Sequence, residues 1–194
     1  SHAIGYHAAE VGFSSPSALA VTSDNILYVS NFGISEGMGG SFSNPLFRPR
    51  ITKTTVDQEH LCDSSTEELV WPEGLAVDKD GNVYCADSYN NTICEYDSDL
   101  NLVSKWGIAG TDLGKFNAPS GLAFDGEDHL IISDSMNNRI QKFRKDGKYI
   151  SSWGSSGTKP GFFQGPWGIS IDNNHDIYVA DWGNDRVQKF SPEG

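Results

Sequence analysis

Glu73 and Asp87 are two carboxylates that depart from the pattern of an internal repeat in this chain. Elsewhere the corresponding aspartate is followed five residues later by an arginine, whereas Asp87 is followed by Thr92 at that distance. Two carboxylates without a cationic partner could transfer protons or bind a cation. The simpler interpretation is that both are solvated acids on an acidic surface.

The pattern that makes these acids visible is an internal repeat. Pro72, Pro119 and Pro166 are separated by steps of 47 residues, and the units that they begin align without gaps. The aligned units read WPEGLAVDKDGNVYCADSYNNTICEYD, APSGLAFDGEDHLIISDSMNNRIQKFR and GPWGISIDNNHDIYVADWGNDRVQKFS. A fourth, more divergent copy precedes them at 15–31. A fixed period in this range predicts an array of identical structural units.

Each unit is predicted to form four short β-strands, with no helical periodicity. Large apolar residues alternate with small ones in the first strand, as Leu75 and Val77 do around Ala76, which fits sheets stacked on both faces. Four-stranded sheets stacked radially form a β-propeller, so we expect an all-β propeller in one domain, 1–194. Its units are expected at about 13–62, 71–107, 116–154 and 163–194. The last unit ends after its third strand, and residues 1–12 are a candidate for a closing strand.

The motif F..P.G followed by D..G..YVAD..N.RIQKF resembles the NHL repeat, a family of propeller blades. The resemblance extends from Phe13 to Phe190 and implies a propeller, but not one function, because relatives include scaffolds, RNA binders and lyases. NHL propellers generally have six blades. Four blades therefore imply an open arc, in a longer chain or in copies that associate through exposed apolar blade faces.

The repeated acid–arginine pairs are interpreted as structural. Asp134 with Arg139, and Asp181 with Arg186, are expected to face each other across the mouth of a β-hairpin. Such a cross-strand pair contributes roughly 0.2–1 kcal/mol and fixes the register of the two strands. The same register places Cys85 opposite Cys94, and the residues leave open whether these two cysteines are bridged or are two thiols. The stretch Asp78–Asn82 resembles the start of a calcium loop but is explained by a hairpin turn.

Candidate binding residues are sought where one unit departs from the others. The segment 32–49 replaces a short turn by a long loop. Loops of this length are usually functional or disordered, so ligand binding and a merely mobile loop both stay open. The candidate ligand contacts on the rim that carries this loop are Phe42, Phe47, Arg48, Arg50, Glu73, Asp87, Tyr89, Trp167 and Trp182.

Proteins with this fold can be non-catalytic scaffolds, enzymes or RNA-binding proteins, and the first two classes are considered first. A non-catalytic binding scaffold, with a protein or small-molecule partner on that rim, is the main hypothesis. The alternative is a propeller lyase or hydrolase with its site at the central channel. The resemblance to amidating lyases implies zinc held by histidines on the inner strands, but Ala18, Gly74, Gly121 and Gly168 have no histidine beside them. We therefore expect no metal and no cofactor.

Charge and hydropathy limit the partners further. The net charge of −12 argues against RNA or other nucleic acid, which the tripartite-motif branch of NHL proteins binds through a basic face. No apolar run approaches the length of a membrane span, so a soluble protein is expected. The cellular compartment stays open.

Overall fold

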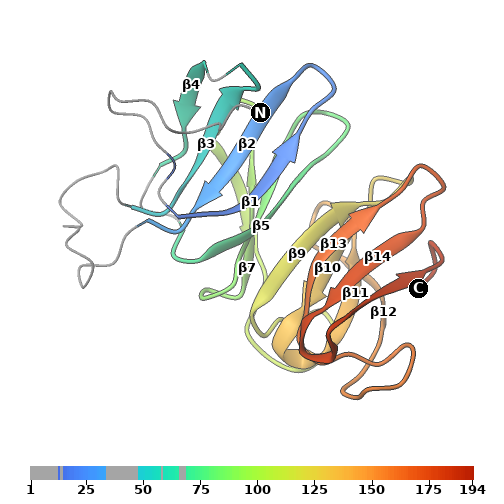
Figure 1. Ribbon diagram of the computed structural model, residues 1–194. Helices are drawn as coiled ribbons and strands as arrows, with labels where there is room; N and C mark the ends of the chain where they lie inside the picture. The colour runs from blue at the N-terminus through green and yellow to red at the C-terminus, as the bar shows by residue number, and fades with distance from the viewer. Residues whose placement is uncertain (1–12, 14, 34–47, 58, 66–68) are drawn as a thin grey trace.

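The structure is a computed structural model that describes residues 13, 15–33, 48–57, 59–65 and 69–194. The described chain forms four antiparallel sheets (Figure 1). The first sheet contains β1 (Pro16–Val21), β2 (Ile26–Asn31), β3 (Arg50–Thr55) and β4 (His60–Asp63). The second contains β5 (Pro72–Val77), β6 (Val83–Asp87), β7 (Thr92–Tyr96) and β8 (Leu102–Trp106). The third contains β9 (Pro119–Phe124), β10 (Leu130–Asp134), β11 (Arg139–Phe143) and β12 (Tyr149–Trp153). The fourth contains β13 (Pro166–Ile171), β14 (Ile177–Asp181) and β15 (Arg186–Phe190).

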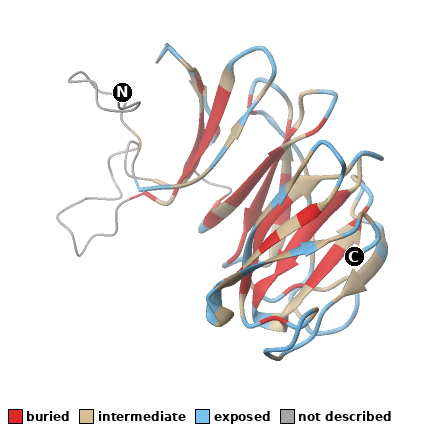
Figure 2. Cartoon of the chain, turned by 45° about the vertical axis from the view of Figure 1, so that its right-hand side comes forward, coloured by how far each residue is buried: buried red, intermediate tan, exposed pale blue. Residues whose placement is uncertain are grey.

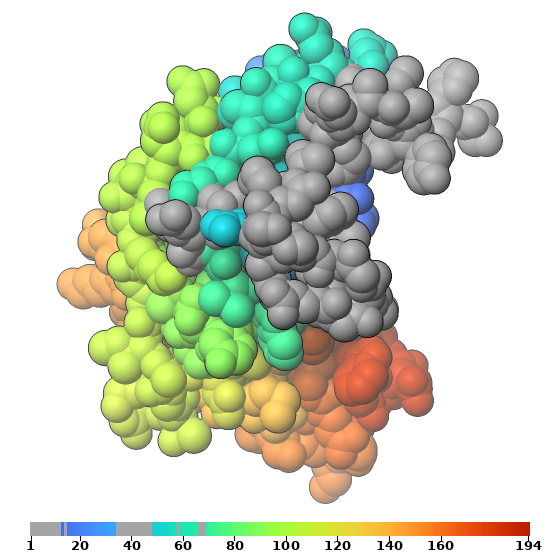
Figure 3. All heavy atoms as spheres, turned by 90° about the vertical axis from the view of Figure 1, so that its left-hand side faces the viewer, coloured from blue at the N-terminus to red at the C-terminus, as the bar shows by residue number. Residues whose placement is uncertain are grey.

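The sheets are the blades of a β-propeller. Strands follow one another in chain order within every sheet, and the innermost strands β1, β5, β9 and β13 contact one another in succession. This arrangement confirms the predicted fold, with three four-stranded blades and a three-stranded fourth blade. The candidate closing strand, 1–12, lies outside the described residues. In Figure 3 the second and third blades join the first blade, at the top, to the fourth blade at the bottom. Among the described residues no helix has the length and apolar content needed to cross a membrane.

Turn chemistry explains the first hairpin of each blade. In the turn between β5 and β6, one carboxylate oxygen of Asp78 accepts the backbone N–H groups of Asp80 and Asn82, at 2.9 and 2.8 Å. Gly81 adopts φ +88°, in the region where glycine is favoured. The stretch that resembles a calcium loop is therefore a hairpin turn.

The blades pack through two different faces. The face of the second sheet that carries Leu75 and Val83 packs on the opposite face of the first sheet, around Tyr28 and Ile51. The same arrangement recurs between the second and third sheets and between the third and fourth sheets. Buried residues consequently run along the strands between neighbouring blades (Figure 2). The core therefore consists of three similar apolar layers between neighbouring blades, which we call seams.

Two cysteines lie within the first of these seams. Cys85 is directly opposite Cys94, as predicted, and both are buried free thiols. Burial raises the pKa of Cys94 to about 11 and raises that of Cys85 as well. They therefore behave as small apolar residues, and the bridged alternative is not formed.

The acid–arginine pairs join the third and the fourth blade to the connection that precedes each of them. Arg139 Nε donates to Asp134 at 2.7 Å, and its remaining nitrogens donate to the carbonyl oxygens of Thr111, Asp112 and Lys115. Arg186 makes the equivalent contacts in the fourth blade, with Asp181 at 2.8 Å. The guanidinium thus fixes a backbone segment as well as the strand register. Two short 3-10 helices, η3 (Ser135–Asn137) and η4 (Trp182–Asn184), complete these hairpins.

Candidate functional site

The candidate site lies at one end of the blades, which we call the mouth rim. It is formed by the first residues of the innermost strands and by the hairpins between the second and third strands of each blade. Pro72 is paired with Asp87 and Pro119 with Asp134, so these strand starts and hairpins lie at the same end of the sheets. The mouth rim therefore gathers residues that are far apart in the sequence.

Glu73, the second residue of β5, is the titratable group best placed for chemistry on this rim. Its side chain is half-buried, and this burial raises its pKa, against a hydrogen bond with Ser88 that lowers it. The nearby negative charge of Asp87 raises the pKa further. A carboxyl group with a raised pKa keeps its proton closer to neutral pH, which suits acid–base work.

Ser88 connects Glu73 to the backbone. The Ser88 hydroxyl can donate to the carbonyl oxygen of Trp71, 3.4 Å away. The hydrogen bond between Ser88 and Glu73 stabilises the ionised carboxylate, so it lowers the pKa that burial raises. In the third blade the same two positions are occupied by Ser120 and Ser135, whose hydroxyl oxygens are 2.6 Å apart. The second blade has therefore replaced one member of a hydroxyl pair by a carboxyl group.

Asp87 does not lie free at the surface, and the interpretation of it as a solvated acid is wrong. It is fully buried and accepts the backbone N–H groups of Val70 and Trp71, at 3.1 and 3.0 Å. The side-chain amide of Asn90 donates to it at 2.7 Å. The N–H group of Asn117 and the amide of Asn137 donate to Asp134 in the same way, so Asp87 keeps most of the neutral donors of that site without its arginine. Asp87 can influence Glu73 through its charge, but no face of it is open to a substrate.

Two aromatic residues lie close in the sequence to Glu73 and to its hydrogen-bond partner Ser88. Trp71 and Tyr89 are exposed, and their rings meet edge to face with centroids 5.7 Å apart. Tyr89 was a sequence candidate, whereas Trp71 was missed. The signal was present in the repeat, because Ala118 and Gly165 occupy the position of Trp71 in the next two units. Exposed paired rings offer an apolar surface on this part of the rim.

The other tryptophans divide into two groups. Trp167 and Trp182 are exposed on the mouth rim of the fourth blade, two blades away from Glu73. Trp106 packs against Phe143, and Trp153 packs against Phe190, as expected for blade packing. The rim thus carries two separate exposed aromatic surfaces.

The long loop of the first blade contributes less than the sequence predicts. Phe42 and Phe47 lie outside the described residues. Arg50 was expected to be an accessible cation, and this is wrong, because it is buried with its Nε 3.3 Å from Asp63 and its Nη1 3.4 Å from the carbonyl oxygen of Arg48. Arg50 occupies the repeat's arginine position, opposite Asn31. Arg48 itself is half-buried.

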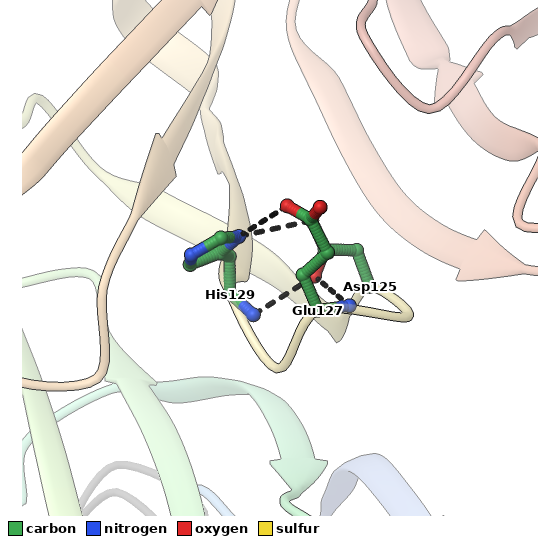
Figure 4. A group of neighbouring side chains, drawn as sticks. All are labelled: Asp125, Glu127 and His129. Atoms are coloured by element: carbon green, nitrogen blue, oxygen red, sulfur yellow. Dashed lines mark hydrogen bonds and ion pairs between the residues drawn. The ribbon is translucent and has the colours of Figure 1, made fainter.

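Groups that could hold a metal ion lie on the opposite rim, in the first hairpin turns. Asp125, Glu127 and His129 bring their ligand atoms within 4.8 Å of one another (Figure 4). Lys142 already contacts Asp125 at 2.7 Å, and His129 Nδ1 lies 3.3 Å from Glu127. One of the three candidate ligands, Asp125, is thus already paired with a lysine of β11.

A second cluster of acidic residues on that rim surrounds the side chain of a lysine. Asp78 and Asp80 of the second blade and Asp128 of the third surround the ammonium group of Lys145, at 3.0, 2.8 and 2.7 Å. The ammonium takes the place that a cation would occupy. A cavity of about 620 Å³ also opens on this rim, lined in part by Asp24.

A zinc site of the amidating-lyase kind does not fit the mouth rim. Such a site needs histidines on the innermost strands, and the described strands β1, β5, β9 and β13 contain none. No step of a reaction at this rim is therefore assigned to zinc.

The four radially packed sheets define the protein as a β-propeller. The family model described as SMP-30/Gluconolactonase/LRE-like region matches residues 19–162, and an NHL repeat model matches residues 163–190. The chain belongs to the SMP-30/gluconolactonase/LRE-like region family, and the NHL resemblance seen in the sequence is confirmed. A comparison with curated proteins finds no match.

Similar solved structures include enzymes. A catalytically inactive virginiamycin B lyase from Staphylococcus aureus with quinupristin is 14% identical, with a TM-score of 0.63 over 93% of this chain and 56% of that one. A candidate gluconolactonase is 14% identical, with a TM-score of 0.69 over 96% of this chain and 61% of that one. Hydrazine synthase from Kuenenia stuttgartiensis is 14% identical, with a TM-score of 0.60 over 96% and 53%. At these identities the likeness concerns the fold alone, and the chain spans little more than half of these structures.

Proposed function

We propose that this propeller is a hydrolase or lyase of cyclic esters, with its reaction centre on the mouth rim at Glu73. The observation that carries the proposal is the half-buried carboxyl group of Glu73, whose pKa burial raises, on the rim that carries an exposed aromatic pair. The family name includes gluconolactonase, and two similar structures are named as a lyase and a gluconolactonase. These names support the enzyme alternative over the scaffold hypothesis.

Glu73 would act as the acid–base group. In a hydrolysis, ionised Glu73 takes a proton from water while the water oxygen attacks the ester carbonyl carbon. The C–O bond of the ring then breaks, and Glu73 returns the proton to the departing alkoxide oxygen, so one water is consumed and the ionised carboxylate is regenerated. The rings of Trp71 and Tyr89 would hold the apolar face of the substrate. Ser88 would orient the Glu73 carboxyl group.

The test is the rate of opening of an aldonolactone by the full chain, compared with the Glu73→Gln variant. We expect a loss of about a hundredfold or more in kcat, because acid–base catalysis typically contributes that much. The matched control is Glu59→Gln, which makes the same change at an exposed turn residue. Equal rates in the wild type and in Glu73→Gln would remove Glu73 from the mechanism.

The second candidate function is a binding scaffold, as the sequence first indicated. It is favoured by Trp167 and Trp182, which are exposed on the same rim but distant in the fold from Glu73. In that case Trp182→Ala would weaken capture of a partner, and Glu73→Gln would leave it unchanged. If Trp182→Ala weakens binding of a ligand and Glu73→Gln does not, the scaffold function is supported. If Glu73→Gln alone impairs turnover of that ligand, the enzyme function is supported.

A further inference from the structure

On the rim opposite the mouth rim, each seam ends between the first hairpin turns of two neighbouring blades. In two of the three seams, a side chain of the later blade reaches the turn of the earlier blade. A carboxylate oxygen of Asp128 in the third blade lies 3.4 Å from the ammonium group of Lys79 in the second. His175 of the fourth blade lies over Gly126 of the third, where a Cβ atom would be 2.5 Å from the imidazole ring. These two seams are therefore bridged at this end.

The seam between the first and second blades lacks the bridging side chain. In the second blade, the repeat position of Asp128 and His175 is occupied by Gly81. All three residues have a positive φ, of +66°, +65° and +88° respectively, so the three turns share one backbone form. A Cβ atom at Gly81 would meet nothing within 4 Å. Only the side chain is missing from this turn, and the space that it would fill is open.

A cavity lies at this unbridged end of the seam. Its volume is about 620 Å³, whereas the cavities at the equivalent ends of the other two seams measure about 300 and 440 Å³. Sites for small organic ligands typically have volumes of roughly 300–1,000 Å³. Every residue that lines the largest cavity belongs to the first or the second blade. It therefore lies between two blades that pack against each other and not on an outer face of the arc.

The wall of this cavity combines carbon surface with hydroxyl groups. Val77 and the ring of Tyr28 supply the carbon surface. Tyr28 is 3% exposed, and its hydroxyl donates to the carbonyl oxygen of Ser98 at 3.3 Å, which fixes the ring in place. Thr22 and Ser23 add their hydroxyl groups. Such a wall suits a small molecule with a short carbon skeleton and several hydroxyl groups.

Both lysines that line the cavity are already engaged. Lys53 donates to the carbonyl oxygen of Ser98 at 2.7 Å, and its ammonium group lies 3.6 Å from Asp99. Lys79 pairs with Asp128 in the next blade, as described above. Neither ammonium group is therefore a free partner for an anionic ligand.

Asp24 is the carboxylate of this cavity that has no cation. It accepts a hydrogen bond from the Thr22 hydroxyl, and within the described part of the chain it forms no ion pair. The charge of Lys53 acts on it only from a greater distance. A cationic group in the cavity would give Asp24 the partner that the fold does not supply.

We propose that the cavity between the first and second blades binds a small hydroxylated primary amine, such as an amino sugar, through an ion pair with Asp24. The carbon skeleton of the ligand would occupy the space beside Gly81, in contact with Tyr28 and Val77. A phosphate or carboxylate ligand is disfavoured by the net charge of −12. The cavity and Glu73 lie on opposite rims, so this proposal does not depend on the proposed function.

The test is a titration of the full chain with glucosamine, followed by the NMR chemical shifts of backbone amides. Glucose is the neutral probe of similar shape. We expect saturable shifts at Ser23, Asp24 and Gly81, with a dissociation constant of about 1 mM, as suits a ligand of about twelve non-hydrogen atoms. Glucose should bind about tenfold more weakly or less, because it cannot form the ion pair.

The first variant removes the charge. Asp24→Asn should weaken glucosamine by about tenfold or more and leave the affinity for glucose unchanged. The matched control is Asp185→Asn, the same change at an exposed residue of the mouth rim, where the third blade has Asn138. This control should bind glucosamine as the wild type does.

The second variant fills the cavity. Gly81→His places in the second blade the side chain that bridges the last seam, and it should abolish binding. Gly81→Ala is its control, because it has the same backbone cost at positive φ but adds only a Cβ atom, and it should still bind. Equal affinities for glucose and glucosamine would overturn the proposal. So would unchanged binding in Asp24→Asn or Gly81→His, or the absence of saturable shifts up to about 50 mM glucosamine.

Discussion

Removing the guanidinium group of Arg139 tests the idea that the repeated pairs are structural. The carboxylate of Asp134 is fully buried, and Arg139 Nε lies 2.7 Å from it. The change Arg139→Ala leaves this carboxylate without a cation. It also leaves the carbonyl oxygens of Thr111, Asp112 and Lys115 without their donor. We expect the third blade and its preceding connection to lose stability together.

The size of the loss follows from burial. An exposed ion pair contributes up to about 1 kcal/mol, whereas removing one partner of a buried pair costs about 3–5 kcal/mol. Asp134 would still accept hydrogen bonds from the backbone of Asn117 and from the side chains of Asn137 and Gln141. These remaining donors place the expected loss of unfolding free energy near the lower value, about 3 kcal/mol.

The loss should depend on pH in a defined direction. Burial already raises the pKa of Asp134 in the folded protein, against the hydrogen bonds and charge that lower it. Without Arg139 that pKa rises further, so the folded state takes up a proton before the unfolded state as the pH falls. The variant therefore regains stability relative to the wild type as the pH falls toward the unfolded pKa, about 3.9. At neutral pH the deficit is fully present.

The assay is urea unfolding of the full chain, followed by circular dichroism at about pH 7 and about pH 4. The double variant Asp134→Asn with Arg139→Ala should recover part of the loss, because it leaves no buried charge. The unfolding free energy of Arg139→Lys should lie between those of the wild type and Arg139→Ala, since an ammonium group cannot donate in the same planar arrangement. A loss below about 1 kcal/mol for Arg139→Ala, or no recovery in the double variant, would refute this reasoning.

Three further predictions concern the seams and the cysteines. Lys145→Ala should lower the unfolding free energy by about 1 kcal/mol, because three carboxylates lose their shared cation, and added calcium should restore part of that loss in a thermal melt. Gly74→Ala should cost about 3 kcal/mol in urea unfolding, since its Cβ atom would overlap a backbone oxygen, while Gly168→Ala, whose Cβ atom would meet nothing within 4 Å, should cost less than about 1 kcal/mol. Cys85 and Cys94 should resist a thiol reagent in the folded protein and react in urea, as titration of free thiols would measure, and protection in urea would reveal a bridge.

The fold was predictable because its constraints recur with a fixed period. Alternating large and small residues identified the strands, and the aspartate–arginine spacing gave the register that places Ile132 opposite Gln141. The same register placed Cys85 opposite Cys94, although nothing in the residues decided between thiols and a bridge. A repeated unit thus reveals what every copy needs for packing.

The candidate site was less predictable, because several partners of its residues are backbone groups that no side-chain pattern reveals. Asp87 seemed to lack a partner, since backbone N–H groups of Val70 and Trp71 are invisible in a comparison of side chains. Arg50 seemed accessible because it follows a long insertion, yet the alignment of Thr52 with Gln141 places it at the buried arginine position. Both departures are compensated within the fold and are structural.

Glu73 is a departure that the fold does not compensate, and this gives a last prediction. Glu73→Ser would restore the residue found at the same position in the third blade, where two hydroxyl oxygens lie 2.6 Å apart. Burial raises the pKa of Glu73, so its contribution to stability is present below the unfolded pKa, about 4.3, and is lost as the pH rises through the folded pKa. The variant should therefore be more stable than the wild type at neutral pH, and this advantage should shrink as the pH falls.

The same substitution should lower activity on a lactone, because serine cannot exchange a proton near neutral pH. Stability and activity then change in opposite directions, which is expected where a group is kept for function at the expense of the fold. Urea unfolding at about pH 7 and about pH 4, with rates on the same samples, measures both quantities. A variant that is less stable at pH 7 and equally active would show that Glu73 is only a packing residue of the second blade, and the mouth rim would then be left to its exposed tryptophans.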